Sequence, residues 1–211
     1  MDIRNTQFAP MSSGEWIEYI SNTELTEEDL CWIYCFGMEW CGLLTDPENL
    51  LDVTQAMLER GMNPNQLVTE ELPDEDPEKN SYLTPLISST RYQNDQASVK
   101  SFNLLLEHGG NPNTMHDFWG PGENIFDFYI WEEYLNAPDL DQVTFYGLLL
   151  CAAYGGKRVN GAQPFTMLTD EPLSVFKDYD RYWFEYDKDE PLGRTFYVVE
   201  KETGRRVARY L

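Results

Sequence analysis

Apolar side chains near the start of the chain recur at the intervals of buried helices. Ser12 and Glu15 have the spacing of a capping box, which marks a helix start. Thr26 and Asp29 repeat that spacing. Residues 30–41 then place apolar side chains at steps of three and four, with aromatic residues between them, so this segment is apolar on nearly every side. We therefore expect two helices, the second of them central.

The helical period continues to about residue 156. Residues 50–58 predict a helix that ends before Gly61, and two more helices are expected within residues 84–108. Residues 125–134 and 143–154 predict another two. The first three quarters of the chain are therefore expected to be helical.

Beyond residue 156 the apolar residues alternate, as is typical of strands. Residues 182–186 place aromatic side chains on one face of a strand, and residues 195–200 and 205–211 flank a short turn that contains Gly204. We therefore predict a mainly α protein of stacked helix-turn-helix units over residues 1–156. A small antiparallel β appendage is predicted over residues 157–211.

One short phrase occurs twice. Residues 57–65 read Met-Leu-Glu-Arg-Gly-Met-Asn-Pro-Asn, and residues 105–113 read Leu-Leu-Glu-His-Gly-Gly-Asn-Pro-Asn. In each copy, glycine supplies the positive φ that ends a helix, and Asn-Pro-Asn turns the chain away. A fainter third copy ends at Gly155. Repetition of this kind indicates stacked units.

The most specific stretch, residues 83–120, resembles an ankyrin repeat. Thr84-Pro85-Leu86 precedes a second helix that ends at Gly109, and an ankyrin repeat consists of a turn plus two helices with the signature Thr-Pro-Leu-His. The resemblance extends over residues 45–156 in all. The repeated glycines lie 48 and 46 positions apart, whereas ankyrin repeats have a period of roughly 33 residues. The resemblance implies a degenerate ankyrin-like stack with insertions. An ordinary helical bundle whose helices end in glycine is the alternative.

The net charge of −22 is concentrated in the helical part. Residues 1–156 hold 5 basic and 27 acidic side chains, whereas residues 157–211 hold 10 of each. Such an acidic surface repels phosphate, which disfavours DNA, RNA and anionic membranes as direct ligands and favours a basic protein partner. Acidity that serves only solubility is the alternative. The basic side chains of Arg194, Arg205, Arg206 and Arg209 are expected to dock onto the acidic helical part, and contact with phosphate is the alternative.

The densest acidic cluster has six carboxylates within residues 70–78, together with two prolines that exclude a helix or a central strand. We expect a loop that projects from the stack as a partner-facing finger; a merely solvated loop is the alternative. Trp119 lies in a turn, either tucked under the next unit or exposed as a binding anchor. The predicted partner-binding residues are Glu70, Glu71, Asp74, Glu75, Asp76, Glu78, Asp117 and Trp119.

Familiar catalytic and metal-binding patterns do not occur along the chain. It has no Gly-x-Ser-x-Gly elbow, no Gly-rich phosphate loop with lysine and no His-Glu-x-x-His. His108 is expected at an exposed helix end and His116 in a turn, which gives a zinc site little support. Cys31, Cys35, Cys41 and Cys151 contain no Cys-x-x-Cys pair and are interpreted as reduced core residues. No cofactor, metal or catalytic residue is predicted.

These patterns favour a cytoplasmic, non-enzymatic protein-interaction module. Neither a signal peptide nor a membrane span is expected. The specific hypothesis is an acidic inhibitor that masks a basic site on a nuclease toxin or a nucleic-acid-binding enzyme, as immunity proteins do. The alternative is a DNA mimic that blocks a nucleic-acid-binding defence or restriction protein. An enzyme with a carboxylate-based site is a third hypothesis.

Overall fold

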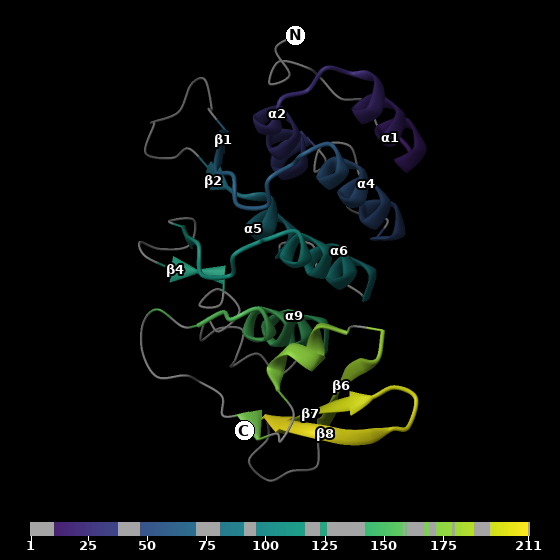
Figure 1. The fold of residues 1–211 in the computed structure, drawn as a ribbon, viewed down its shortest axis with the longest axis vertical. Helices are drawn as coiled ribbons and strands as arrows, with labels where there is room; N and C mark the ends of the chain where they lie inside the picture. Colours follow the sequence, from purple (N-terminus) through teal and green to yellow (C-terminus); the bar gives the residue numbers. More distant parts are fainter. Residues whose placement is uncertain are drawn as a thin grey trace.

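The computed structural model describes most of the helical part and much of the C-terminal part of the chain. The described residues are 11–37, 47–70, 81–90, 96–116, 123–125, 142–157, 159, 167–168, 172–178, 180–187 and 195–210. They form a mainly α structure with a small antiparallel sheet at the C-terminal end (Figure 1).

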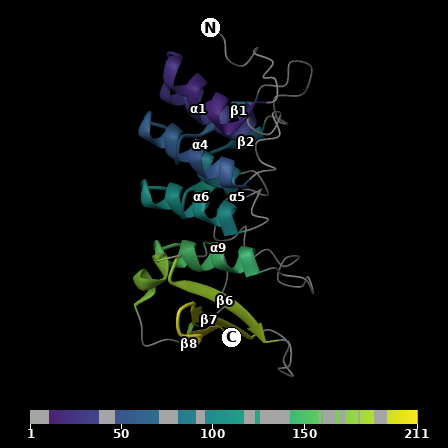
Figure 2. The ribbon, with the colours of Figure 1, turned by 90° about the vertical axis from the view of Figure 1, so that its right-hand side faces the viewer.

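Four helices form a row, each packed on the next. They are α1 (Ser13–Asn22), α4 (Pro47–Glu59), α6 (Gln96–Glu107) and α9 (Gln142–Ala153). The contacts run from α1 to α4, from α4 to α6 and from α6 to α9, and Figure 2 shows the four helices in successive layers. The predicted helix over 143–154 is confirmed by α9.

Shorter helices lie beside this row. They are α2 (Glu27–Trp32), the π-helix η2 (Ile33–Gly37) and α5 (Pro85–Thr90), and α5 contacts both η2 and α6. Residues 30–37 are all buried, which confirms the prediction that this segment is central. The predicted continuation to residue 41 lies outside the described residues.

Both predicted capping boxes are present. The backbone N–H of Glu15 donates to Ser12 Oγ at 3.3 Å, and the Ser12 N–H donates to Glu15 Oε2 at 2.8 Å. The Ser12 N–H and then the Ser12 hydroxyl, which donates to the same Oε2 at 2.8 Å, lower the pKa of Glu15. The Thr26 and Asp29 pair makes the equivalent contacts at 3.1 and 2.9 Å. Each box satisfies helix N–H groups that have no partner within the helix.

Two small antiparallel ladders follow the repeated turns. One joins β1 (Val68–Glu70) to β2 (Ser81–Leu83), and the other joins β3 (Met115–His116) to β4 (Glu123–Asn124). The sequence pattern predicted neither ladder. Glu70 was expected in a loop and His116 in a turn, and both predictions were wrong because backbone pairing extends the strands to these residues.

The C-terminal sheet has the order β5-β8-β7-β6. Its strands are β5 (Met167–Leu168), β6 (Tyr182–Asp187), β7 (Thr195–Glu200) and β8 (Arg205–Tyr210), and the 3-10 helix η5 (Leu173–Lys177) precedes β6. The three longer strands match the predicted ones. Gly204 ends the turn between β7 and β8 with φ of 68°, a conformation that glycine adopts without strain.

Helix α9 is apolar on every side because it packs between two parts of the structure. It contacts α6 on one side and η5 and β6 on the other. Phe176 and Tyr182, from η5 and β6, are buried and meet edge to face with ring centroids 5.3 Å apart. The same hydrophobic core contains side chains from α1 to β8. The sheet therefore covers the last helix of the row.

Two basic side chains of β8, those of Arg205 and Arg206, pair with carboxylates of the same sheet. Arg205 Nε lies 3.8 Å from Glu200 Oε2, and Arg206 Nε lies 3.5 Å from Glu185 Oε2. For these two arginines the expected docking onto the acidic helices was wrong, because strand pairing places carboxylates of β6 and β7 beside them. Arg194 and the side chain of Arg209 lie outside the described residues.

Several other expectations concern single residues. Cys31, Cys35 and Cys151 are buried reduced thiols, as predicted, and Cys41 lies outside the described residues. His108 is exposed at the end of α6, also as predicted. Of the predicted helix over residues 125–134, the structure describes Ile125 alone. Within the described part of the chain, no helix has the length and apolar character that a bilayer crossing needs.

The contact of η5 with α9 predicts a large effect on stability from one side chain. Phe176 is fully buried, so Phe176→Ala should lower the free energy of unfolding by about 3–5 kcal/mol through lost burial and the remaining cavity. Urea unfolding followed by far-ultraviolet circular dichroism measures this change. Val159→Ala, at a side chain that is 45% exposed, is the control. A Phe176→Ala change no larger than that of the control would contradict the covering role of the sheet.

Candidate functional site

Helices α4, α6 and α9 end in the same backbone geometry. Gly61, Gly109 and Gly155 have φ of 96°, 91° and 83°. In each case the glycine N–H and the next N–H donate to carbonyls of the last helical turn, for example Gly61 to Leu58 at 3.0 Å and Met62 to Met57 at 3.0 Å. This is the Schellman arrangement, which satisfies carbonyls at a helix end. The faint third copy of the repeat therefore has the same local structure as the two clear copies.

The last asparagine of each Asn-Pro-Asn turn joins its own unit to the next one. Asn65 Nδ2 donates to the carbonyl oxygen of Gly109 at 2.9 Å, and the N–H of Asn111 donates to Asn65 Oδ1 at 2.7 Å. Asn113 makes the same pair of bonds one unit later, to the Gly155 carbonyl at 3.0 Å and from the Lys157 N–H at 2.8 Å. We call these contacts the asparagine bridges.

The sequence pattern assigned these asparagines to the turns and did not indicate their role between units. The first residue of each motif does shape the turn, since Asn63 Oδ1 accepts from the Asn65 N–H at 3.0 Å and Asn111 Oδ1 accepts from the Asn113 N–H at 3.0 Å. The recurrence of the second asparagine at the same distance from glycine was the available signal. A side chain that donates and accepts at once suits a pair of neighbouring backbone groups.

The bridge position changes in the third unit. Asn65 and Asn113 stand four residues after their glycines, and Val159 holds that place after Gly155. Valine has no side-chain hydrogen-bonding group, so the series of asparagine bridges ends there, where the sheet begins to cover α9. At the other end, Arg60 donates to the carbonyls of Ser21 and Thr23 at 3.0 and 3.1 Å and joins α4 to the end of α1.

The two ladders occupy equivalent places in successive units. Val68 pairs with Leu83, the residue before the helix-capping Thr84. In the next unit Met115 pairs with Asn124, whose position corresponds to that of Thr84. Figure 1 shows β1, β2 and β4 on the same side of the row of helices. The turns that precede both ladders are joined by the Asn65 bridge. We call the segments 66–83 and 114–124 finger 1 and finger 2.

The fingers contain all of the predicted partner-binding residues. Glu70 is the last residue of β1 and pairs with Ser81. The others lie outside the described residues, within segments that the two ladders close: Glu71, Asp74, Glu75, Asp76, Glu78, Asp117 and Trp119. The structure thus brings the ends of both segments to one side of the molecule.

Two exposed apolar side chains on the fingers were not predicted from the sequence. Leu67 and Met115 are 50% and 49% exposed, and with Val159 they are the large apolar side chains most open to solvent among the described residues. Each stands six residues after the glycine that ends the preceding helix. Their equivalence could have been found by aligning the two copies of the repeat beyond Asn-Pro-Asn.

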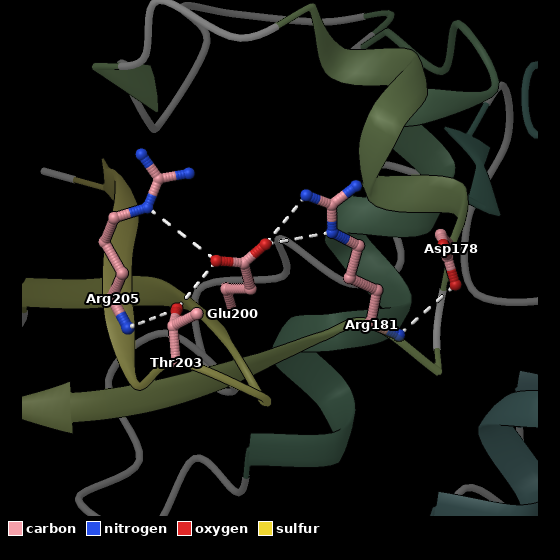
Figure 3. A network of polar contacts seen from close by, with 5 residues as sticks. All are labelled: Asp178, Arg181, Glu200, Thr203 and Arg205. Atoms are coloured by element: carbon pink, nitrogen blue, oxygen red, sulfur yellow. Dashed lines mark hydrogen bonds and ion pairs between the residues drawn. The ribbon is translucent and has the colours of Figure 1, made fainter.

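A second polar cluster lies in the C-terminal sheet, around Glu200 (Figure 3). Glu200 is 7% exposed, and its Oε1 accepts from Arg181 Nη2 at 2.7 Å and Nε at 3.0 Å. Oε2 accepts from Thr203 Oγ1 at 2.7 Å. The Thr203 hydroxyl and the Arg181 guanidinium lower the pKa of Glu200. Because one oxygen is bonded to the β7–β8 turn and the other to Arg181, just before β6, the carboxylate holds that turn against the start of β6.

The two cysteine thiols with shifted pKa values are protonated at neutral pH. Burial raises the pKa of the Cys31 thiol to about 11 and raises that of Cys151 still further. A protonated thiol is a poor nucleophile and a poor metal ligand. Among the described residues, no group of three or more histidine, cysteine, aspartate or glutamate side chains could hold a metal ion.

Comparisons with known proteins gave no relative. No protein-family model matches the chain, and neither a curated protein nor a solved structure matches it. The side of the molecule that carries the ladders at the bases of both fingers is the strongest candidate surface.

The asparagine bridges predict a stability effect at an exposed turn. Asn65→Ala removes a donor and an acceptor between two units and should lower the free energy of unfolding by about 1–2 kcal/mol. Urea unfolding monitored by circular dichroism measures the change. The control is Gln66→Ala in the same turn, because the Gln66 side chain donates to the adjacent Leu67 carbonyl and so bonds within its own turn. Equal effects of the two substitutions would argue against the bridge.

The Glu200 cluster predicts a pH-dependent contribution to stability. Its folded-state pKa lies below the ordinary value of 4.5, so its stabilisation is fully present above that value and is lost as pH falls through the lowered pKa. Glu200→Gln should therefore destabilise the protein at about pH 7, and its difference from the wild type should shrink towards about pH 3. Urea unfolding at the two pH values measures this. The exposed Glu202→Gln is the control, and a pH-independent difference for Glu200→Gln would contradict the charge-based role.

Proposed function

We propose that this chain is an acidic protein-interaction module that binds and covers a basic site on another protein. The observation that carries the proposal is the placement of the ladders at the bases of both fingers on one side of the row of helices, with the turns that precede them joined by the Asn65 bridge. Loops held on a rigid scaffold are common binding elements in proteins. The two fingers together offer a larger contact area than either would alone.

The scaffold we propose is a degenerate ankyrin-like stack. Three features support this: the order of ladder, short helix and long helix in β1–β2, α5 and α6; the Thr84 cap before that short helix; and the recurring glycine helix ends. The insertions that lengthen the spacing between glycines correspond to the fingers and to segments before the long helices. In this arrangement the repeat sets the positions of the fingers and the fingers supply specificity.

Charge indicates the kind of partner. The excess of carboxylates lies in residues 1–156, and finger 1 contains the densest acidic cluster of the chain. An acidic surface accelerates encounter with a basic protein and repels nucleic acid. A basic nuclease toxin or a nucleic-acid-binding enzyme fits this description, because each has a positive surface that phosphate normally occupies. Binding there would inhibit by occlusion, in the manner of an immunity protein.

The exposed apolar residues favour this function over pure DNA mimicry. A mimic relies on rows of carboxylates, whereas protein interfaces usually combine a central apolar contact with a polar rim. Leu67 and Met115 are about half exposed at the bases of fingers that carry acidic residues. That combination matches an apolar contact with a charged surround.

Neutralising finger 1 tests the proposal. Asp74→Asn, Glu75→Gln and Asp76→Asn together should lower the association rate with the partner by about tenfold at low salt, because steering depends on local charge. The partner is first obtained by capture from the lysate of the native organism at low and high salt, and the rate is then measured by surface plasmon resonance. Folding should be unchanged by circular dichroism.

A matched variant removes three carboxylate charges outside finger 1. Glu18→Gln, Glu24→Gln and Asp52→Asn lie at exposed positions on or next to α1 and α4, so they should change the rate far less. Equal effects of the two triple variants would show that only net charge matters. A captured partner that is neutral or acidic, or whose binding ignores salt, would contradict the proposed function.

A further inference from the structure

Leu67 and Met115 share one place in the repeated structure. Each follows the last asparagine of Asn-Pro-Asn by two residues and begins a finger. Extending the β1–β2 register by one pair sets Leu67 opposite Thr84, and Met115 pairs with Asn124 at the corresponding position of the next unit. Two equivalent positions in successive units therefore carry a large apolar side chain that is half exposed.

Neither residue is among the buried side chains of the hydrophobic core. A single exposed leucine needs no explanation, because folded proteins expose much apolar surface. Recurrence at equivalent positions is different, since polar residues would satisfy the turn equally well in both units. The repeated choice indicates contact with something outside the chain.

The distance between the two side chains is constrained by the scaffold. Helices α4 and α6 pack directly on each other, and packed helices lie about 8–10 Å apart. The turns that precede Leu67 and Met115 are joined by the Asn65 bridge, whose two hydrogen bonds are 2.9 and 2.7 Å long. Equivalent positions on the two turns should therefore be separated by about one helix layer.

The charge of the helical part indicates the partner. Leu67 and Met115 both belong to residues 1–156, which hold 27 acidic and 5 basic side chains. An acidic or neutral segment would gain nothing from this acidic excess, and a second copy of this chain, with net charge −22, would be repelled. A basic segment with apolar side chains meets both requirements.

We propose that Leu67 and Met115 form a pair of apolar anchors for one segment of a partner protein, which presents two large apolar side chains about one helix layer apart with Lys or Arg beside them. This inference rests on the proposed function and specifies its partner. The apolar pair sets the position of the segment along the stack, and the acidic excess of residues 1–156 attracts its basic residues. Loss of both anchors should weaken binding by about ten- to hundredfold, from the apolar area that stays in water.

A displayed library of random peptides of about 15 residues, which span about 22 Å as helices, provides the probe. Peptides are selected on the wild-type protein and their affinities are then compared on Leu67→Ser/Met115→Ser. Val159→Ser removes a similarly exposed apolar side chain outside the pair and is the control. Unfolding curves establish that all three proteins are folded, and peptides with their apolar pair replaced by serine repeat the test from the other side.

The expected result is a set of basic peptides with two large apolar residues at a constant interval, which bind the double variant about ten- to hundredfold more weakly and the control as well as the wild type. Basic peptides that lack the apolar pair and bind the double variant as tightly as the wild type would overturn the anchor proposal but not the proposal of an acidic inhibitor. Acidic or neutral peptides that need the anchors would overturn the acidic inhibitor and the basic segment together. Failure to enrich any peptide would overturn the anchor proposal.

Discussion

The asparagine bridge between neighbouring turns is the interaction on which the arrangement of the fingers depends. Packing of α4 on α6 buries apolar surface but leaves some freedom of sliding, because dispersion and burial are not directional. The Asn65 amide removes that freedom by bonding to the Gly109 carbonyl and the Asn111 N–H at once. Those groups are available only because glycine ends α6 with a positive φ. The same glycine turn therefore ends α6 and supplies the backbone groups that align the two units.

Much of the architecture follows from local sequence signals. The capping boxes, the glycine helix ends, α9 and the three longer C-terminal strands were predicted because each depends on residues a few positions apart. The β1–β2 and β3–β4 ladders were not, since strands of two or three residues are too short to produce an alternating pattern. The π-helix η2 was also missed, because the same apolar periodicity suits an α-helix.

The candidate surface was only partly predictable for a related reason. The acidic cluster of finger 1 is visible in composition, but the closeness of the turns that begin the two fingers arises from contacts between residues more than 40 positions apart, such as Asn65 with Gly109. Leu67 and Met115 look ordinary in the sequence, and only their exposure in the fold distinguishes them from core residues. The pairing of the β8 arginines failed as a prediction because strand register decides which carboxylate is nearest.

The apolar character of α9 on every side has a consequence for synthesis of the chain. Helices α1, α4 and α6 can bury their apolar faces against one another as they leave the ribosome, in the order in which they are made. Helix α9 cannot, because its second face is covered by η5 and β6, which are translated later. Until residues 173–187 emerge, that face of α9 has not yet met the elements that cover it, and exposed apolar surface of this kind favours aggregation of a nascent chain.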